Sequence, residues 1–200
     1  MANPYRLKML SLLSHGEKTI DELAQATDQS LAAASAHMKV LRANHLVAAD
    51  KRGRSVYCRL ASPQVEKLWL HLRDVGEQIV PEIREIMRED FDSDEYLSPL
   101  TEQQLHEKIR REGVTLLDLR PATEFAAGHL PTARNVPFSE LADALKSLPK
   151  RSPLLVYCRG PFCAAAYAGN RQLRENRYRS ERLRFSLPEW KAAGLPVEIS

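Results

Sequence analysis

The sequence predicts an α/β protein in two parts: a mainly α winged helix-turn-helix domain, followed by an α/β domain with a parallel sheet. Three observations support this prediction. Helical patterns joined by a polar turn precede two strand patterns around a basic glycine turn. Strand and helix patterns then alternate in the second half of the chain, as in a parallel sheet covered by helices. The length of 200 residues also fits two domains of about a hundred residues each.

Composition and charge exclude several classes of protein. No apolar run approaches the roughly 20 residues that span a bilayer, and the amino terminus lacks a secretion signal. The three cysteines are an odd number and do not form the disulfide framework of a secreted domain. We therefore expect a cytoplasmic protein with no membrane partner. The net charge of +3 is small, but residues 30–60 hold six basic side chains against one acidic one, which indicates a basic face on the first domain.

The first domain is predicted to contain three helices and a hairpin. The helices are expected over residues 5–13, from Asp21 onward, and over 31–43, with Ser30 as the N-cap of the third. The hairpin has strands at 46–47 and 55–60 around a charged glycine tip, and forms the wing.

The third helix combines small and polar side chains. Ala32, Ala33 and Ala36 leave little bulk on one side, so the helix can lie deep in the major groove of DNA. The expected core-facing residues are Leu31, Ala34, Met38 and Leu41. The candidate DNA contacts, to base edges or phosphates, are Ser30, Ser35, His37, Lys39, Arg42, Lys51, Arg52 and Arg54. The alternative for these residues is an ordinary solvated face and a soluble turn.

Four motifs in this domain resemble the arsenic-repressor (ArsR/SmtB) winged-helix regulators. They are Asn3-Pro4-Tyr5-Arg6-Leu7, Thr19-Ile20-Asp21-Glu22-Leu23-Ala24, Ser35-Ala36-His37-Met38-Lys39-Val40-Leu41 and Gly53-Arg54-Ser55-Val56-Tyr57. The resemblance implies a homodimer on a pseudo-palindromic double-stranded DNA operator, with half-sites about one helical turn apart.

The chain departs from this family at several positions. Ala36 stands where such regulators often carry a longer polar side chain, which weakens the expected base readout. Metal-sensing members place cysteines in the helix before the turn, whereas residues 21–26 contain none. Cys58 and His71 have no neighbouring ligand pair in the sequence, so we expect no metal site.

Residues 63–90 predict one long helix with an apolar stripe. Its members are Val65, Leu68, Leu72, Val75, Ile79, Ile83 and Ile86, and Pro81 is expected to kink the helix. A stripe this long indicates dimerisation, with packing on the same domain as the alternative. The expected domains are therefore residues 1–90 and 100–200, joined by an acidic linker at 91–99.

The second domain is predicted from alternating strands and helices. Helices are expected over 101–112, 122–127, 139–147 and 164–173, and strands over 114–119, 135–137 and 154–157. Active sites in such sheets lie at the carboxyl ends of the strands, where Cys158 falls.

Cys158 stands between a strand and a helix, which is a position that suits a reactive thiol. Amides at a helix N-terminus favour an anion, so we expect them to stabilise the Cys158 thiolate, with Arg159 as an adjacent cation. Cys163, five residues later, could act as a resolving thiol. The alternative is that Cys158 is a small buried hydrophobic residue.

The second domain resembles the rhodanese family. The motifs are Leu117-Asp118-Leu119-Arg120-Pro121, Glu124-Phe125, Gly128-His129-Leu130-Pro131, Ala133-Arg134-Asn135-Val136-Pro137, Tyr157-Cys158-Arg159-Gly160-Pro161-Phe162-Cys163, Leu187-Pro188-Glu189-Trp190 and Ala193-Gly194-Leu195-Pro196-Val197. The resemblance implies that Cys158 carries sulfane sulfur as a persulfide. It also implies structural roles for Asp118 and Arg120, which we favour for Glu124 and His129 as well, over an acid–base cluster.

The second domain departs from the rhodanese pattern at three positions. Cys163 stands where many members have a basic residue, which argues against rapid turnover of thiosulfate. Arg177 and Ser186 replace glycines that the family usually has in turns. No cofactor is expected.

The two halves together predict a DNA-binding regulator, with repression as the favoured output, whose rhodanese domain senses or handles reactive sulfur through Cys158. The expected catalytic residues are Cys158, Arg159 and Cys163, and the expected donor is a small molecule such as thiosulfate or polysulfide. One alternative is a sulfurtransferase tethered to a DNA-binding domain. The other is a metal- or arsenic-responsive repressor.

Overall fold

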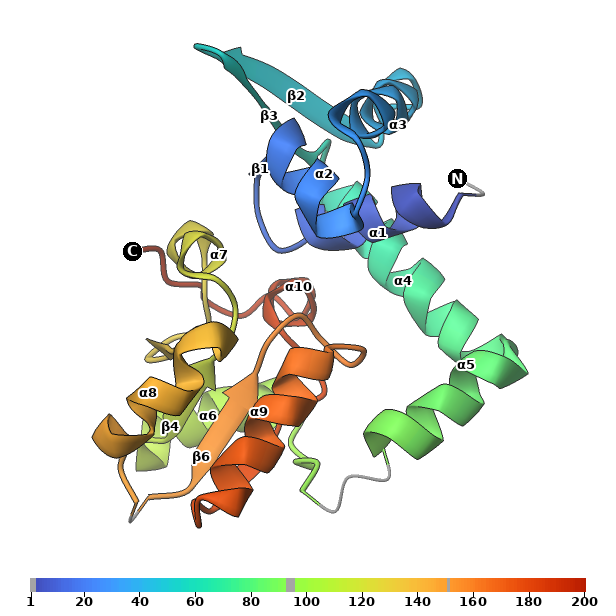
Figure 1. Ribbon diagram of the computed structural model, residues 1–200. Coiled ribbons are helices and arrows are strands. Elements are labelled where there is room, and N and C mark those ends of the chain that lie inside the picture. Colours follow the sequence, from blue (N-terminus) through green and yellow to red (C-terminus); the bar gives the residue numbers. More distant parts are fainter. Residues whose placement is uncertain (1–2, 93–95, 151) are drawn as a thin grey trace. The chain divides into compact units, whose positions relative to one another are not determined.

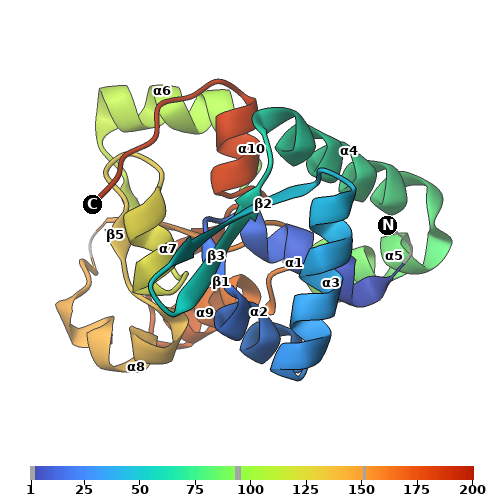
Figure 2. The same ribbon diagram turned by 90° about the horizontal axis from the view of Figure 1, so that it is seen from above.

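The computed structural model describes residues 3–92, 96–150 and 152–200, and the chain divides into two compact units, Met1–Val75 and Gly76–Ser200 (Figures 1 and 2). The predicted domain limits at residues 90 and 100 remain predictions, because the expected linker includes residues 93–95, which lie outside the described residues.

The first unit is a winged helix-turn-helix, as predicted. Its helices are α1 (Pro4–Leu13), α2 (Ile20–Thr27) and α3 (Leu31–Ala43), and its strands are β1 (Lys18–Thr19), β2 (Val47–Arg52) and β3 (Ser55–Leu60). The strands form an antiparallel sheet in the order β1-β3-β2, with Arg52 opposite Ser55 at the tip of the wing. Gly53 makes the tight turn between β2 and β3 with a φ of 60°, which favours glycine.

Capping side chains decide where the helices begin. Ser30 caps α3 as predicted, because its Oγ accepts a hydrogen bond from the amide of Ala33 at 3.2 Å. The helix α2 begins at Ile20 rather than at Asp21. The reason is a capping box in which Thr19 accepts from the amide of Glu22 while the Glu22 carboxylate accepts from the amide of Thr19.

The core of the first unit lies between α1, α2, α3 and the sheet. Ala34, Met38 and Leu41 are buried on α3, in agreement with the prediction. The prediction for Leu31 was wrong, because this side chain is 51% exposed. Leu31 is the first residue of α3, beside the turn, so the helices that cover Ala34 do not reach it.

The long helix predicted over 63–90 is interrupted. It consists of α4 (Pro63–Ile79), α5 (Pro81–Ile86) and a π-helical segment at Met87–Asp92. The break falls at Val80, the residue before Pro81, which has extended backbone angles as expected of a residue that precedes proline. Along the predicted stripe Leu68, Leu72 and Ile79 remain exposed.

The second unit contains a parallel sheet, as predicted, in the order β5-β4-β6-β7. Its strands are β4 (Thr115–Asp118), β5 (Arg134–Asn135), β6 (Leu154–Tyr157) and β7 (Ser180–Arg182). Its helices after α5 are α6 (Glu102–Glu112), α7 (Ala122–Ala127), α8 (Leu141–Ala144), α9 (Ala164–Glu175) and α10 (Leu187–Ala192). Figure 1 shows α8 and α9 beside β6.

Each face of this sheet has its own hydrophobic cluster, because successive residues of a strand point to opposite sides. Leu117 and Val156 pack with Leu141 of α8 and Leu173 of α9. On the other face, Leu116 and Leu155 belong to the cluster that contains Leu105 of α6 and Trp190 of α10.

Two predicted elements of this unit differ from the structure. The helix expected over 139–147 is α8 flanked by 3-10 turns at Phe138–Glu140 and Leu145–Ser147, so Ser139 lies inside a turn and caps no helix. The strand expected over 135–137 is limited to Arg134–Asn135. Pro137 has no amide hydrogen to continue the ladder.

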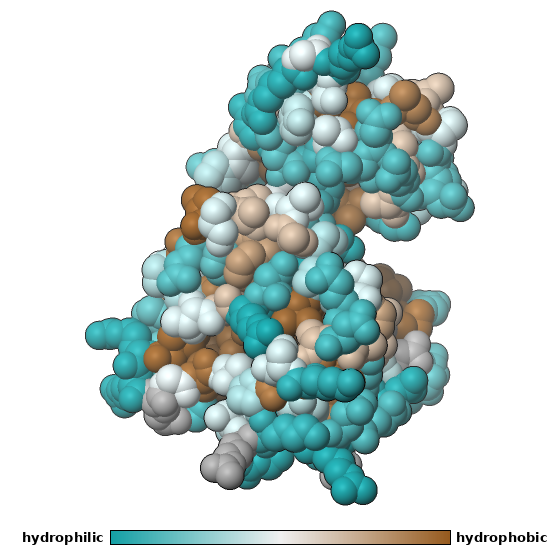
Figure 3. Space-filling model, turned by 60° about the vertical axis from the view of Figure 1, so that its left-hand side comes forward, coloured by the Kyte–Doolittle hydropathy of each residue, from teal (hydrophilic) through white to brown (hydrophobic). Residues whose placement is uncertain are grey.

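Among the residues with described structure, no helix is both long and apolar enough to cross a bilayer. The face in Figure 3 shows hydrophilic side chains interrupted by small apolar patches.

Candidate functional site

The loop after β6 brings the two predicted thiols together. Cys158 follows Tyr157, the last residue of β6, and Cys163 is the N-cap residue of α9. Between them the chain turns at Gly160, whose φ of 94° favours glycine, and the amide of Cys163 donates to the Gly160 carbonyl at 3.2 Å. Both thiols are free, and the two side chains influence each other's pKa.

The two sulfur atoms have different surroundings. The hydrogen bond with Cys163 raises the pKa of the Cys158 thiol, and so does burial, since Cys158 is 3% exposed. The pKa of Cys163 is lowered, first by the hydrogen bond from Cys158 and then by the amides of Arg159, Ala165 and Ala166, which outweigh burial. Cys163 makes no side-chain capping hydrogen bond at the start of α9. The stabilisation of the Cys158 thiolate by loop amides remains a prediction.

Arg159 is held by a carboxylate. Its Nη2 donates to Oε1 of Glu124 at 2.6 Å and its Nε donates to Oε2 at 3.0 Å. Glu124 lies in the first turn of α7 and is almost completely buried. The expected cation beside the Cys158 sulfur is therefore present, but its charge is balanced by Glu124.

Ser186 also contacts the reactive loop. Its hydroxyl donates to the carbonyl oxygen of Cys158, and it precedes α10, where it forms a capping box with Glu189. The pattern Ser-x-x-Glu in the sequence could have predicted this helix start. No feature of the sequence indicated its contact with Cys158.

Asp118, Arg120 and His129 have structural partners. The completely buried Arg120 donates from Nη2 to Asp118 at 2.5 Å and to the Gly128 carbonyl at 2.8 Å, so it ties the end of β4 to the loop after α7. His129 stacks on Phe125 with ring centroids 3.7 Å apart and hydrogen-bonds its carbonyl oxygen. These contacts favour structural roles over an acid–base cluster.

A cavity of about 300 Å³ opens beside Cys158. It is lined by Leu119, Pro121, Ala122, Pro137, Phe138, Ser139, Glu140, Cys158, Arg159 and Ala165. Cys163 is not among the described residues that line it. A small molecule in this space would lie beside Cys158.

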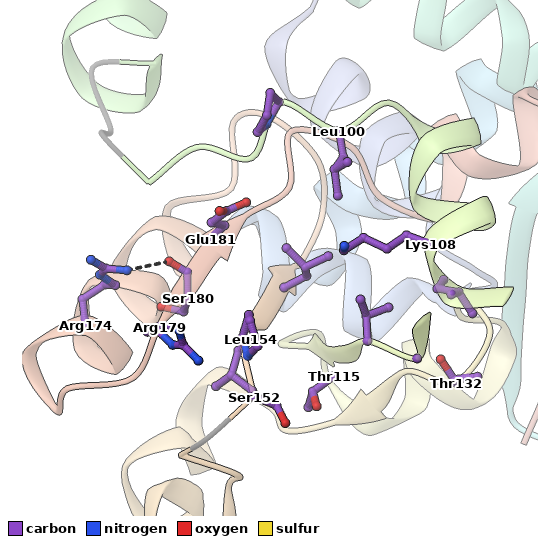
Figure 4. A pocket seen from close by; sticks show the side chains of 16 residues that line it. Leu100, Lys108, Thr115, Thr132, Ser152, Leu154, Arg174, Arg179, Ser180 and Glu181 are labelled. Carbon is purple, nitrogen blue, oxygen red and sulfur yellow. Dashed lines mark hydrogen bonds between the residues drawn. The ribbon is translucent and has the colours of Figure 1, made fainter. Parts of the chain in front are cut away.

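A larger cavity, of about 900 Å³, lies at the opposite end of the sheet (Figure 4). Its wall includes Thr115, Leu154 and Ser180, the first residues of β4, β6 and β7, together with Arg174, which donates to the Ser180 carbonyl at 3.4 Å. Cys158 follows the carboxyl end of β6, so this cavity is separate from the two thiols.

The predicted DNA contacts fall into two groups in the first unit. Ser35, Lys39 and Arg42 on α3, and Lys51 and Arg54 on the wing, are exposed.

The other predicted contacts have partners within the protein. Ser30 caps α3, and His37 is half-buried and stacks on Tyr5 with centroids 5.8 Å apart. Arg52 binds both carboxylate oxygens of Glu17, at 2.6 and 2.9 Å, and lies over the ring of Tyr57.

Within the described parts of the chain, no group of three or more His, Cys, Asp or Glu side chains could hold a metal ion. Cys58 is completely buried in β3, and burial raises the pKa of its thiol to about 11.

Comparisons with known families assign both halves. The family described as "Bacterial regulatory protein, arsR family" matches residues 3–49, and the family described as "Rhodanese-like domain" matches residues 101–193. An HTH-type transcriptional regulator of Mycobacterium tuberculosis is 34% identical over 198 residues, which are 99% of this chain and 87% of the relative. A sulfurtransferase of Allochromatium vinosum is 31% identical over 87 residues, 43% of this chain and 79% of the relative.

Two solved structures resemble the separate halves. The homodimeric winged helix-turn-helix DNA-binding domain of a possible ArsR-family regulator from Mycobacterium bovis is 33% identical, with a TM-score of 0.39, and the match covers 40% of this chain and 75% of that domain. A rhodanese-related protein from Thermoplasma volcanium is 25% identical, with a TM-score of 0.46, and the match covers 52% of this chain and all of that one.

Proposed function

Because the chain belongs to the arsR family of bacterial regulatory proteins and carries a rhodanese-like domain, we propose that it represses transcription from an operator and that reactive sulfur bound to Cys158 changes its affinity for that operator. The chain is a transcriptional regulator. One observation carries the sulfur part of the proposal: the free thiol of Cys158 belongs to a residue that lines a cavity, on the same loop as the free thiol of Cys163.

The DNA part of the proposal uses the exposed polar and basic residues of α3 and the wing. Lys39, Arg42, Lys51 and Arg54 contact phosphates, and Ser35 contacts base edges. A role on chromosomal DNA implies a cytoplasmic location.

A homodimer follows from the exposed stripe on α4. Leu68, Leu72 and Ile79 are 46%, 39% and 67% exposed, and a second copy of the same helix would cover them. The two recognition helices of such a dimer fit a pseudo-palindromic operator with half-sites about one helical turn apart.

The sulfur chemistry proceeds in two steps. The Cys158 sulfur attacks the sulfane sulfur of a polysulfide or thiosulfate, the S–S bond of the donor breaks, and a shorter polysulfide or sulfite leaves. Cys163 then attacks the inner sulfur of the Cys158 persulfide and releases hydrosulfide. The result is a Cys158–Cys163 disulfide, in which the two cysteines are oxidised and the sulfane sulfur is reduced.

The test combines two measurements on one sample of the full chain. Intact mass and operator affinity are determined before and after treatment with sodium tetrasulfide, for the wild type and for Cys158→Ser. We expect the wild type to gain sulfur on Cys158 first, then to lose that sulfur and two hydrogens as the disulfide forms, and to change its affinity, while the variant does none of these. Sulfur loading without any change in affinity would refute regulation by sulfur.

The likeness to a sulfurtransferase favours a second candidate, an enzyme tethered to a DNA-binding domain. Steady-state turnover of thiosulfate with a thiol acceptor supports this candidate. The absence of turnover in a protein that still loads sulfur argues against it.

A further inference from the structure

The cavity beside Cys158 has a mainly apolar lining. Six of its ten described lining residues are apolar, namely Leu119, Pro121, Ala122, Pro137, Phe138 and Ala165. The other described members of the lining, besides Cys158, are Ser139, Glu140 and Arg159. A volume of about 300 Å³ suits a small ligand, and an apolar lining with few polar groups favours a ligand that has an apolar part.

The ring of Phe138 is a fixed part of this lining. Phe138 begins the 3-10 turn Phe138–Glu140, and its amide donates to the Leu119 carbonyl at 3.1 Å, beside the end of β4. Gly169 of α9 makes room behind the ring, because a Cβ atom there would clash with Leu119 and lie 3.5 Å from Cδ2 of Phe138. Phe138 is still 39% exposed, so its ring can contact a ligand in the cavity.

The cation of the cavity is already neutralised. Arg159 binds both carboxylate oxygens of the buried Glu124 through Nη2 and Nε, at 2.6 and 3.0 Å. Its remaining N–H groups can donate a hydrogen bond to a ligand, but the ion pair has no net charge. Glu140 is exposed, so solvent screens its carboxylate. A dianion that entered the cavity would lose hydration and meet no uncompensated cation among the described lining residues.

We propose that the sulfur donor at Cys158 is an organic compound with an apolar group next to its sulfane sulfur and no more than one negative charge. This assignment rests on the proposed function above and narrows it, because thiosulfate is a dianion without an apolar group and is then a poor donor. Phe138 contacts the apolar group. Arg159 supplies a hydrogen bond but no net charge for a second anionic group.

An organic thiosulfonate illustrates the reaction. Cys158–SH and R–SO₂–S⁻ give Cys158–S–SH and R–SO₂⁻. The S–S bond of the donor breaks and the S–S bond of the persulfide forms, while the thiol proton passes to the terminal sulfur. The sulfinate leaves with the electron pair of the broken bond and carries the single negative charge, so no other oxidant or reductant is needed.

Three donors that share the same sulfane group separate charge from apolar area. Benzenethiosulfonate and methanethiosulfonate each carry one negative charge and differ only in the organic group. Thiosulfate has an oxygen in place of that group and a second negative charge. The readout is the rate at which the full chain releases sulfinate or sulfite in a single turnover at pH 7, with sulfur on Cys158 confirmed by mass spectrometry.

Two corrections make the three rates comparable. The rate of the Cys158→Ser variant is subtracted, which removes reactions of other thiols. Each rate is then divided by the rate of the same donor with 2-mercaptoethanol, which removes the intrinsic reactivity of the donor. We expect the corrected rates of the wild type to decrease from benzenethiosulfonate to methanethiosulfonate to thiosulfate.

Phe138→Ala tests the contact with the apolar group. We expect it to slow loading from benzenethiosulfonate about tenfold, because the ring no longer covers the phenyl group of the donor. Loading from methanethiosulfonate should change little, which also shows that the loop is intact. Phe138→Leu keeps an apolar side chain and should retain most of the preference for benzenethiosulfonate. Thermal unfolding of both variants measures any loss of stability.

Glu124→Gln tests the role of charge. It frees the charge of Arg159, and a second negative charge on the donor doubles the attraction to that cation. Loading from thiosulfate should therefore rise about threefold relative to benzenethiosulfonate. This gain should fall in about 1 M salt, which screens charges but would not reverse a loss of packing. Asp143→Asn removes an exposed carboxylate of α8 outside the described cavity lining and is the control.

The possible outcomes distinguish this inference from the proposed function. Corrected rates that are equal for the three donors, or highest for thiosulfate, overturn the donor class and leave the proposed function intact. Equal slowing of both thiosulfonates by Phe138→Ala overturns the contact with the ring, and an unchanged donor ratio in Glu124→Gln overturns the role of charge. A wild type that gains no sulfur on Cys158 from any of these donors or from sodium tetrasulfide overturns the proposed function itself.

Discussion

Arg159 and Glu124 form a two-point ion pair that joins the reactive loop to α7, with Nη2–Oε1 and Nε–Oε2 distances of 2.6 and 3.0 Å. The Glu124 carboxylate is buried while the Arg159 side chain is 35% exposed, so the pair holds the base of the loop and leaves one side of the guanidinium at the cavity. Arg159 lowers the pKa of Cys158, although the neighbouring Cys163 and burial raise it more.

The Glu124→Gln substitution removes the charge that balances Arg159. We expect a loss of about 1 kcal/mol in the free energy of unfolding, which is below the usual value for hydrogen bonds to charged groups because solvent screens Arg159. The freed cation lies beside Cys158, so sulfur loading should become faster at neutral pH. Urea denaturation and the sulfur-loading rate measure the two effects. Glu140→Gln, at an exposed carboxylate of the same cavity, is the matched control, and an equal effect of both variants contradicts the role of the pair.

The Asp118→Asn substitution should be much more destabilising. Asp118 and Arg120 have no exposed side-chain surface, so loss of the carboxylate leaves a guanidinium charge buried without a charged partner. Breaking one side of such a pair costs about 3–5 kcal/mol. Urea denaturation checks this, with the exposed Asp143→Asn as the control. A loss below about 1 kcal/mol would show that Arg120 is satisfied by other groups, such as the Gly128 carbonyl.

Cys58 gives the stability of the first unit a specific pH dependence. Burial raises the pKa of this thiol from its ordinary value of 9.0 to about 11, so the folded state keeps the proton that the unfolded chain loses. Its contribution is complete below pH 9 and is lost as the pH rises to about 11. We expect this loss to be of the order of 2–3 kcal/mol. The stability of Cys58→Ala should lack this part of the decline, and parallel curves for the two proteins between pH 8 and 11 would contradict the assignment.

The sequence patterns predicted the folds of both halves because each rests on local signals. Ser30 is an N-cap by residue type, and the parallel sheet follows from alternating strand and helix patterns. Such local patterns do not predict contacts between segments that are far apart in the chain. The partners Glu17 and Arg52 are 35 residues apart, as are Glu124 and Arg159, and only the folded chain shows that they pair.

The surroundings of the two thiols could not be predicted for a related reason. Sequence places both cysteines before α9, but only the folded chain shows that Arg159 is bound to Glu124 and that Ser186 contacts the Cys158 carbonyl. The backbone conformation at Arg177 could not be predicted from the sequence either. Arg177 occupies a position where the resemblance to the rhodanese family implies glycine, and its φ of 65° lies in the left-handed region that favours glycine.

The contrast between Lys39 and Arg52 tests the proposed DNA interface. Lys39 is exposed on α3, whereas Arg52 is bound to Glu17, so only Lys39 can bind a phosphate without breaking an ion pair. We expect Lys39→Ala to weaken operator binding and to reduce the slope of log affinity against log salt by about 1, whereas Arg52→Ala changes this slope by much less. Fluorescence anisotropy over a range of salt concentrations measures both slopes. Equal slope changes would mean that the Glu17–Arg52 ion pair opens when the protein binds the operator. Arg52 on the wing would then bind a phosphate, in contradiction to the proposed interface.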